Sequence, residues 1–194
     1  MEKLVVLGAG ESGNGAAILG QLNGWDVFVS EYGTIKPNYL QELEQYGIAY
    51  EQGGHHTDII LSAALVVKSP GIPDTAPIVK AIKEKGIKII SEIEFAYLYK
   101  GDSKIIGITG SNGKSTTTAL TYHVFKTAGY DVSMVGNIGI SFAKQVALHP
   151  TAWYIIEISS FQLDDIDTFK PDVAVLLNIT PDHLDRYDYR FEKY

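Results

Sequence analysis

Residues 107–117 read Gly-Ile-Thr-Gly-Ser-Asn-Gly-Lys-Ser-Thr-Thr, and this stretch decides the expected fold of the chain. It follows a short apolar run, Ile105–Ile108, which is typical of a buried strand, and it opens a threonine-rich helix. Glycines let backbone N–H groups turn toward phosphate oxygens, and the positive N-terminal end of the helix faces the same oxygens. The pattern therefore predicts a strand, a phosphate-binding loop and a helix.

The loop departs from the usual P-loop in one position. That pattern places a glycine at the position of Ile108, whereas here the glycine is Gly110, so the loop reads G-x-x-G-K-S. Lys114 can still reach the β- and γ-phosphates, and Ser115 offers a hydroxyl group to Mg²⁺. A glycine-rich turn without a ligand is the alternative interpretation.

A second glycine motif lies near the N-terminus. The run Gly8-Ala-Gly-Glu-Ser-Gly13 follows an apolar segment at 3–8 and matches G-x-G-x-x-G. The next predicted strand, 26–30, ends at Glu31, about 20 residues beyond the motif. This is the βαβ arrangement that binds a dinucleotide or nucleotide diphosphate, with an acid placed for a ribose or base. Tight strand–helix packing without a ligand is the alternative.

The alternation of strands and helices predicts an α/β fold with two units. The first is a Rossmann-like, parallel-sheet domain at 1–98, and the second is an incomplete P-loop α/β ATPase domain at 99–194, with the polar, turn-rich segment 100–104 at the boundary. Expected strands lie at 3–8, 26–30, 48–51, 64–68, 87–90, 105–108, 131–135, 153–158 and 173–178. Expected helices lie at 13–22, 37–46, 75–85 (capped by Thr75), 92–99 and from the loop to Ala128, with Leu120, Val124 and Ala128 on one face.

Composition narrows the classes of function. The chain has 194 residues, no cysteine and a net charge of −7. The absence of cysteine excludes disulfides and thiolate metal sites and favours a cytoplasmic protein. The acidic balance argues against nucleic acid as a partner, and no apolar run approaches the roughly 18 residues that span a bilayer.

Polar side chains follow three predicted strands of the second unit. Glu157 ends an apolar strand and is placed as a Walker-B acid for Mg²⁺, while Asn137 could donate to a phosphate or substrate oxygen. His183, beside Asp182 and Asp185, suits a divalent ion or a bound phosphate. A solvated acid, a turn asparagine and a structural histidine are the respective alternatives.

Two further stretches are less specific. The rigid turn Ser69-Pro-Gly-Ile-Pro73 follows a strand, where open α/β sheets bind ligands, but a plain turn has the same composition. His55 and His56 are adjacent histidines that could be metal ligands. Because no acids lie at ligand spacing, a solvated loop is the expected state of both histidines.

The order of these motifs resembles the Mur ligases of bacterial cell-wall synthesis, and within that family the branch that adds D-glutamate. The resemblance covers the whole chain, and the variant loop is the form this family uses. It rests on the two glycine motifs together with Gly136-Asn-Ile-Gly139, Glu157-Ile-Ser-Ser-Phe-Gln-Leu163 and Asn178-Ile-Thr-Pro-Asp-His-Leu-Asp-Arg186.

The resemblance implies a role for each matching residue. ATP would be held by Gly110, Ser111, Asn112, Gly113, Lys114, Ser115 and Thr116. The UDP-linked substrate would contact Gly10, Glu11, Ser12, Glu31, Gly71 and Asn137. Ser115 and Glu157 would bind one Mg²⁺, and His183 a second Mg²⁺ or the acyl phosphate. Lys114, Asn137, Glu157 and His183 would be the catalytic residues. Glu31 is longer than the aspartate often found at its position in the family.

The reaction implied by the resemblance is an ATP-dependent amide ligation. The alanyl carboxylate of UDP-N-acetylmuramoyl-L-alanine is phosphorylated, and D-glutamate attacks the acyl phosphate. Family members are more than twice as long, so this chain is expected to be the N-terminal portion of a monomeric enzyme and inactive alone. Two features of the family would lie beyond Tyr194. One is a modified lysine that helps to hold the second Mg²⁺, and the other is the site that binds D-glutamate. The alternative is a stand-alone module that binds a UDP-sugar or an NAD-type dinucleotide without catalysis.

Overall fold

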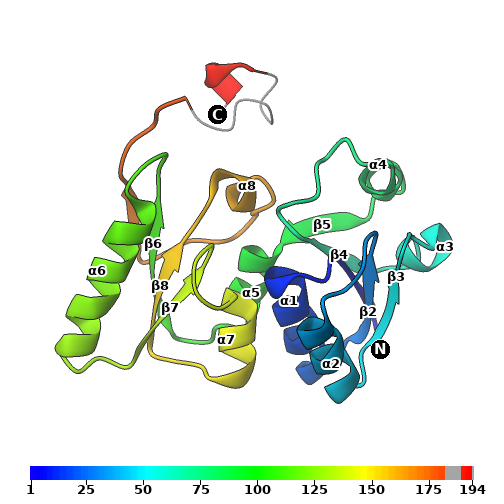
Figure 1. Cartoon of the computed structure of the whole chain (residues 1–194), viewed down its shortest axis with the longest axis horizontal. Coiled ribbons are helices and arrows are strands. Elements are labelled where there is room, and N and C mark those ends of the chain that lie inside the picture. The colour runs from blue at the N-terminus through cyan, green and yellow to red at the C-terminus, as the bar shows by residue number, and fades with distance from the viewer. Residues whose placement is uncertain (182–188, 194) are drawn as a thin grey trace.

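Two parallel β-sheets organise the chain, as the computed structural model shows for residues 1–181 and 189–193 (Figure 1). The first sheet has the strand order β3-β2-β1-β4-β5, and the second has the order β7-β8-β6-β9. All pairings between these strands are parallel. The predicted α/β class, with a Rossmann-like N-terminal domain, is therefore confirmed.

The first sheet and its helices follow the predicted order with small shifts. The strands are β1 (Lys3–Leu7), β2 (Asp26–Glu31), β3 (Ala49–Gln52), β4 (Leu65–Lys68) and β5 (Lys88–Ser91). The helices are α1 (Glu11–Leu22), α2 (Pro37–Gln45), α3 (Thr57–Ile60), α4 (Pro77–Glu84) and α5 (Glu92–Tyr99). The short helix α3 was not predicted. The predicted cap at Thr75 is wrong, because Ala76 is the N-cap and Pro77, whose ring fixes a helical φ, opens α4.

The second sheet contains the phosphate loop between its first strand and helix. Its elements are β6 (Lys104–Thr109), α6 (Lys114–Thr127), β7 (Val132–Gly136), α7 (Phe142–Leu148), β8 (Trp153–Glu157), α8 (Ser160–Leu163), β9 (Val173–Leu176) and the 3-10 turn η2 (Phe191–Lys193). Helix α7 was not predicted. Ser159 caps α8 through a capping box with Gln162.

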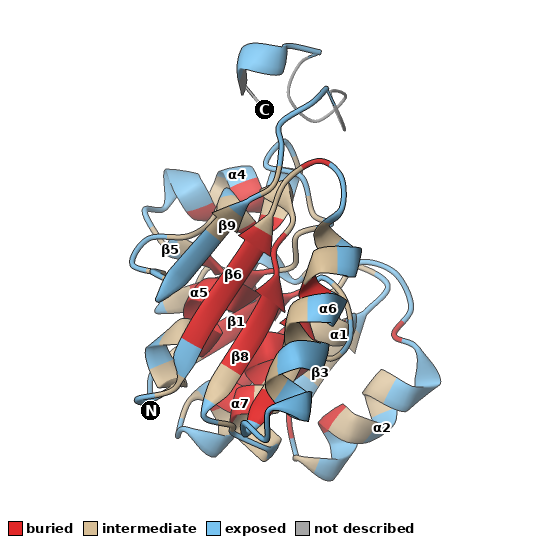
Figure 2. Ribbon diagram, turned by 90° about the vertical axis from the view of Figure 1, so that its left-hand side faces the viewer, coloured by how far each residue is buried: buried red, intermediate tan, exposed pale blue. Residues whose placement is uncertain are grey.

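Successive side chains of β1 point to opposite faces of the first sheet and so belong to two different buried clusters. Leu4 and Val6 face one buried cluster, while Val5 and Leu7 face another that α3 and α4 complete. Because helices cover both faces, these four residues have no exposed surface. Figure 2 shows the same burial along β1, β6 and β8.

The two sheets share one hydrophobic core. The cluster that contains Leu4 also contains Ala16 of α1, Phe95 of α5, Phe142 of α7 and Tyr154 of β8. The rings of Phe142 and Tyr154 meet edge to face, with centroids 4.9 Å apart. Helices α1 and α5 therefore pack directly against α7 of the second unit.

Polar contacts also fix the two units relative to each other. Lys68 Nζ lies 2.9 Å from Asp165 Oδ2, and Lys144 Nζ lies 2.7 Å from Glu42 Oε1. The carboxylate of Glu94 accepts the backbone N–H groups of Asp167, Thr168 and Phe169. Burial would raise the pKa of Glu94, but the hydrogen bond from the Thr168 hydroxyl and these backbone hydrogen bonds outweigh burial and hold the pKa below its usual range.

The outer face of α6 is exposed to solvent. Leu120 and Val124, which were predicted to share one face, are 61% and 55% exposed, whereas Thr118 is fully buried. Tyr122 and Phe125 of α6 pack instead against Ile108 and its neighbours on the second sheet. No helix among the described residues is long and apolar enough to cross a bilayer.

Candidate functional site

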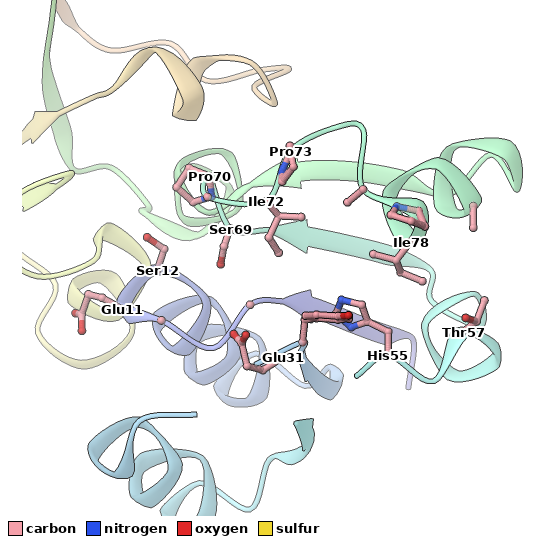
Figure 3. A pocket seen from close by; sticks show the side chains of 17 residues that line it. Glu11, Ser12, Glu31, His55, Thr57, Ser69, Pro70, Ile72, Pro73 and Ile78 are labelled. Carbon is pink, nitrogen blue, oxygen red and sulfur yellow. The ribbon is translucent and has the colours of Figure 1, made fainter. Parts of the chain in front are cut away.

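A cavity of about 910 Å³ opens at the carboxyl edge of the first sheet (Figure 3). Parallel strands end at one edge, so the segments after β1, β2 and β4 meet there. The cavity is lined by residues that include five of the six predicted contacts of the UDP-linked substrate: Gly10, Glu11, Ser12, Glu31 and Gly71. The fold thus brings residues from three separate stretches into one wall.

The three glycines of the first motif have different roles. A Cβ on Gly8, whose φ is +89°, would lie 2.6 Å from Ser69 Oγ, and one on Gly13 would lie 1.9 Å from the Gly8 carbonyl oxygen. Gly8 is therefore required by its positive φ and by the Ser69 side chain, and Gly13 is required by close packing against the backbone. A Cβ on Gly10 would meet no atom within 4 Å. Gly10 therefore leaves space at the cavity wall, where a ligand can approach the backbone.

Glu31 connects the end of β2 to the glycine motif. Its Oε2 accepts the backbone N–H of Ala9 at 2.8 Å, and its Oε1 accepts that of Gly33 at 2.8 Å. The longer side chain noted in the sequence therefore reaches the loop itself. Both oxygens are held, so the carboxylate has a defined place in the cavity wall.

Glu11 marks the end of the cavity that faces the second unit. Its Oε1 accepts the backbone N–H of Ser141, the N-cap of α7, at 3.1 Å. Burial raises the pKa of Tyr39, and the charge of Glu11 beside the Tyr39 hydroxyl raises it further. Asn137, the sixth predicted substrate contact, is not among the residues that line this cavity.

Asn137 and Glu157 lie together at the carboxyl edge of the second sheet. Asn137 Nδ2 donates to Glu157 Oε1 at 2.8 Å, and the backbone N–H of Asn137 donates to the Glu157 carbonyl at 2.9 Å. Glu157 is 1% exposed, and its Oε2 is buried without a hydrogen-bond partner. An orphaned carboxylate oxygen is unusual in a folded protein and suits a divalent cation such as Mg²⁺.

The phosphate loop is shaped by two glycines and its own lysine. Gly110 and Gly113 have φ values of +138° and +87°. Lys114 Nζ donates to the carbonyls of Gly110 at 2.6 Å and Ser111 at 3.0 Å. Ser115 and Thr116 are exposed on the first turn of α6. Lys114 thus lies against the loop, with its ammonium group at the position where the loop turns into the helix.

A segment after β9 supports the phosphate loop, and sequence reasoning did not assign it this role. Asn178 accepts the Asn112 N–H through Oδ1 at 2.9 Å and donates to the Asn112 carbonyl at 2.9 Å. The backbone N–H of Thr180 donates to Ser111 Oγ at 2.9 Å. The signal in the sequence was the polar cluster at this strand end, which predicted a site but not its contact with the loop.

Metal ligation rests on few protein groups. Among residues 1–181 and 189–193, no three or more histidine, cysteine or acidic side chains gather closely enough to hold a metal. Mg²⁺ that is bound to nucleotide phosphates needs only one or two protein ligands, so Ser115 and Glu157 still fit it. His183 lies outside the described residues, and its predicted role stays a prediction.

His55 belongs to the cavity, and the prediction of a solvated loop is wrong for it. Its side chain lines the cavity, and its Nδ1 lies 2.6 Å from Ser30 Oγ. His56 does remain exposed. The available signal was that Ser30 and Glu51 end neighbouring strands, which brings the loop after β3 to the same edge.

Two protein families match this chain over separate stretches. The family described as "Mur ligase MurD-like, N-terminal domain" matches residues 2–91, and "Mur ligase middle domain" matches residues 108–194. A protein of Cytophaga hutchinsonii named "UDP-N-acetylmuramoylalanine--D-glutamate ligase" is 58% identical over all of this chain and 43% of its own length. A protein of the same name from Bacteroides fragilis is 57% identical over all of this chain and 44% of its own length.

Solved structures agree on the fold. The protein of Neisseria meningitides named "UDP-N-acetylmuramate:L-alanyl-gamma-D-glutamyl-meso-diaminopimelate ligase" superimposes with a TM-score of 0.62 at 22% identity, over 96% of this chain and 63% of that one. The UDP-N-acetylmuramate-alanine ligase of Thermotoga maritima superimposes with a TM-score of 0.61 at 21% identity, over 100% of this chain and 45% of that one. This chain spans about 43% of the length of the curated relatives it matches.

Proposed function

We propose a function from one premise: the chain belongs to the Mur ligase family. Its first domain binds the UDP part of UDP-N-acetylmuramoyl-L-alanine, and its second domain binds ATP. The observation that carries the proposal is the 910 Å³ cavity, whose wall joins the glycine motif, Glu31 and the turn at Gly71. Glu11 at its end contacts the second domain, which supports a substrate that runs from one domain toward the other.

The proposed reaction joins D-glutamate to the alanyl carboxylate through an acyl phosphate. Both the carboxylate and the γ-phosphate carry negative charge, so the site must neutralise them before they can react in line. Lys114 supplies a positive charge at the phosphate loop, and the N-terminal end of α6 adds its dipole. A Mg²⁺ held by Ser115 and Glu157 supplies further neutralisation when it is bound.

Asn137 has a positioning role in this proposal. Its amide holds Glu157 Oε1, which leaves Oε2 as the carboxylate oxygen for the cation. Since Asn137 follows β7 and Glu157 ends β8, the pair faces the space beyond the sheet edge. His183 is proposed to complete the site with a second Mg²⁺ or the acyl phosphate.

The first test is a calorimetric titration of the 194-residue chain with UDP-N-acetylmuramoyl-L-alanine, UDP and NADH. We expect both UDP compounds to bind and NADH not to bind. Gly71→Val should weaken UDP binding at least tenfold, because Gly71 lines the cavity and a Cβ there meets no protein atom that would disturb the fold. Lys80→Ala, an exposed change on α4 outside the cavity wall, is the control. Tight NADH binding without UDP binding would reject the proposal in favour of an NAD-type module.

The second test concerns catalysis by these residues alone. We expect no phosphate release that depends on UDP-N-acetylmuramoyl-L-alanine and D-glutamate, because the chain matches only about 43% of its relatives' length. A coupled phosphate assay measures this, with a full-length relative as the positive control. Substrate-dependent release from the chain would show that it is a complete catalyst.

The use of ATP and a nucleotide-activated sugar places the proposed reaction in the cytoplasm, and we propose that the protein acts as a monomer.

A further inference from the structure

The cavity has two ends with different surroundings. Figure 3 shows Glu11 and Ser12 at one end and His55 and Thr57 at the other. Glu11 contacts Ser141 of the second domain, so the reacting part of the proposed substrate belongs at that end. The nucleobase then falls at the opposite end. There the ring of Tyr32 lies beside His55, with centroids 5.6 Å apart, and offers an apolar surface to a flat ring.

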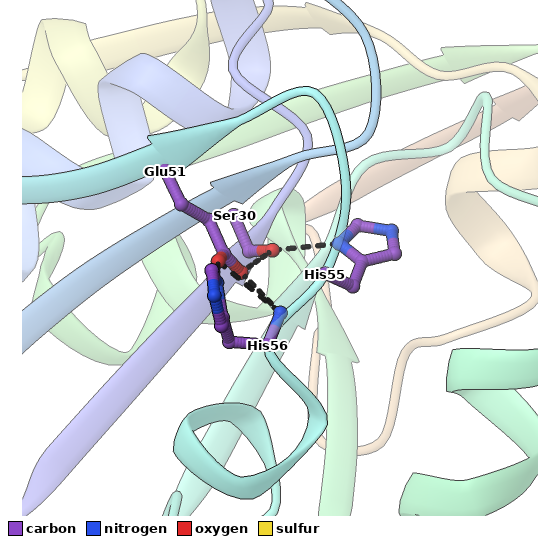
Figure 4. A network of polar contacts seen from close by, with 4 residues as sticks. All are labelled: Ser30, Glu51, His55 and His56. Atoms are coloured by element: carbon purple, nitrogen blue, oxygen red, sulfur yellow. Dashed lines mark hydrogen bonds and ion pairs between the residues drawn. The ribbon is translucent and has the colours of Figure 1, made fainter.

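A partly buried network holds His55 in place (Figure 4). Ser30 Oγ lies 2.6 Å from Glu51 Oε1 and 2.6 Å from His55 Nδ1. Ser30 and Glu51 are register partners on β2 and β3, so the sheet sets their separation. Ser30 is fully buried, whereas His55 is partly exposed at the cavity. The network therefore links a rigid sheet to a side chain in the cavity wall.

Glu51 is the charged end of this network. Burial would raise its pKa, but the hydrogen bonds from Ser30 and from the backbone and ring of His56 outweigh burial and lower the pKa. Glu51 is therefore ionised at neutral pH and can only accept hydrogen bonds. Its oxygens accept from Ser30 Oγ at 2.6 Å and from the His56 N–H at 3.0 Å.

The proton positions follow from counting donors. A serine hydroxyl has one hydrogen, and Ser30 gives it to Glu51. The Ser30 oxygen then faces His55 Nδ1 with a lone pair, so Nδ1 must carry the hydrogen in their contact. In a neutral imidazole with hydrogen on Nδ1, the other nitrogen, Nε2, is an acceptor. Nε2 lies on the side of the ring away from Ser30 (Figure 4).

We propose that His55 is a specificity-determining residue whose Nε2 accepts a hydrogen bond from the imide N–H of a uracil ring. Ser30 and Glu51 are positioning residues that fix the tautomer. The inference rests on the proposed function, because it takes the cavity to be the UDP site. Uracil carries a hydrogen on N3, whereas cytosine carries a lone pair there, so an acceptor at this place favours uracil.

The test compares UDP with N3-methyluridine diphosphate, which lacks the donor, by calorimetry at pH 8. We expect the wild-type chain to bind the methylated compound at least tenfold more weakly. In His55→Ala, UDP should bind about tenfold more weakly than in the wild type, and the two ligands should bind within about twofold of each other. His56→Ala is the matched control, because His56 touches Glu51 but does not line the cavity, and it should keep the tenfold preference.

A second measurement reads the tautomer directly. Nitrogen-15 chemical shifts of labelled His55 should show hydrogen on Nδ1 in the wild type, and Ser30→Ala should populate both tautomers and reduce the preference for UDP. UDP binding with no preference, or a preference that survives in His55→Ala, would overturn the inference and leave the proposed function in place. No binding of UDP to the wild type would overturn both.

Discussion

Gly13→Ala is expected to lower the free energy of unfolding by about 3 kcal/mol or more. The added Cβ would lie 1.9 Å from the carbonyl oxygen of Gly8 and 2.9 Å from its carbonyl carbon. Both atoms belong to the backbone, so no side chain can rotate away. Either α1 or the turn after β1 must move, and each carries residues of the shared core. Urea unfolding followed by circular dichroism measures the loss.

Gly10→Ala is the matched control within the same motif. Its Cβ would meet no atom within 4 Å, and its φ of −79° suits alanine. Gly10 is the N-cap of α1, so its replacement by alanine should lower the free energy of unfolding by no more than about 1 kcal/mol. It should instead weaken UDP binding, because the methyl group occupies space at the cavity wall. Equal unfolding midpoints for the two variants would show that Gly13 packing does not limit stability.

Glu92→Gln is expected to stabilise the protein by about 3 kcal/mol at pH 8.5 and to change little at pH 4.5. Glu92 begins α5 and is 2% exposed, where the two units meet. Its Oε1 accepts the Ala143 N–H at 2.5 Å, and its Oε2 is buried without a partner. Burial raises the pKa of Glu92, hydrogen bonds from Ala143, Ser141 and Phe142 lower it, and the charge of Glu11 raises it, so that the resulting pKa is about 7.

The sign of the effect follows from proton binding. Between the ordinary value of 4.5 and the folded value of about 7, the folded state binds a proton that the unfolded state has released. Stability from protonated Glu92 is therefore complete below about pH 4.5 and is lost as the pH rises through 7. Glutamine keeps the acceptor for Ala143 and stays neutral, so it does not lose this stability.

The measurement is urea unfolding of the wild type and Glu92→Gln between pH 4.5 and 8.5. The difference between the two free energies should grow between pH 4.5 and about pH 7 and level off above that, where both states have released the proton. Glu84→Gln, at an exposed position on α4, is the control and should give no such trend. Parallel curves for Glu92→Gln and the wild type would show that Glu92 is already ionised in the folded protein at low pH.

Local pattern determined the elements and the class of the fold. The strands β1, β2, β4, β6, β7 and β8 lie within two residues of the predicted positions, because short apolar runs between glycine turns must be buried. The need for glycine at Gly13 is also local, since a Cβ there would meet the carbonyl group of Gly8 five positions earlier, whereas the Cβ excluded at Gly8 would meet Ser69 from another strand end. The candidate wall at Gly10, Glu31 and Gly71 could be predicted because parallel strands end at one edge.

Tertiary structure alone decided which distant groups meet. Glu11 accepts a hydrogen bond from a residue 130 positions away, and the phosphate loop is held by Asn178. His55 looked solvated because its partner Ser30 lies 25 positions earlier, on another strand. The shared face of Leu120 and Val124 on α6 could be predicted, but its exposure to solvent could not, because periodicity shows that a face is apolar and not what covers it. Such contacts depend on how sheets and helices pack, which no local window of sequence contains.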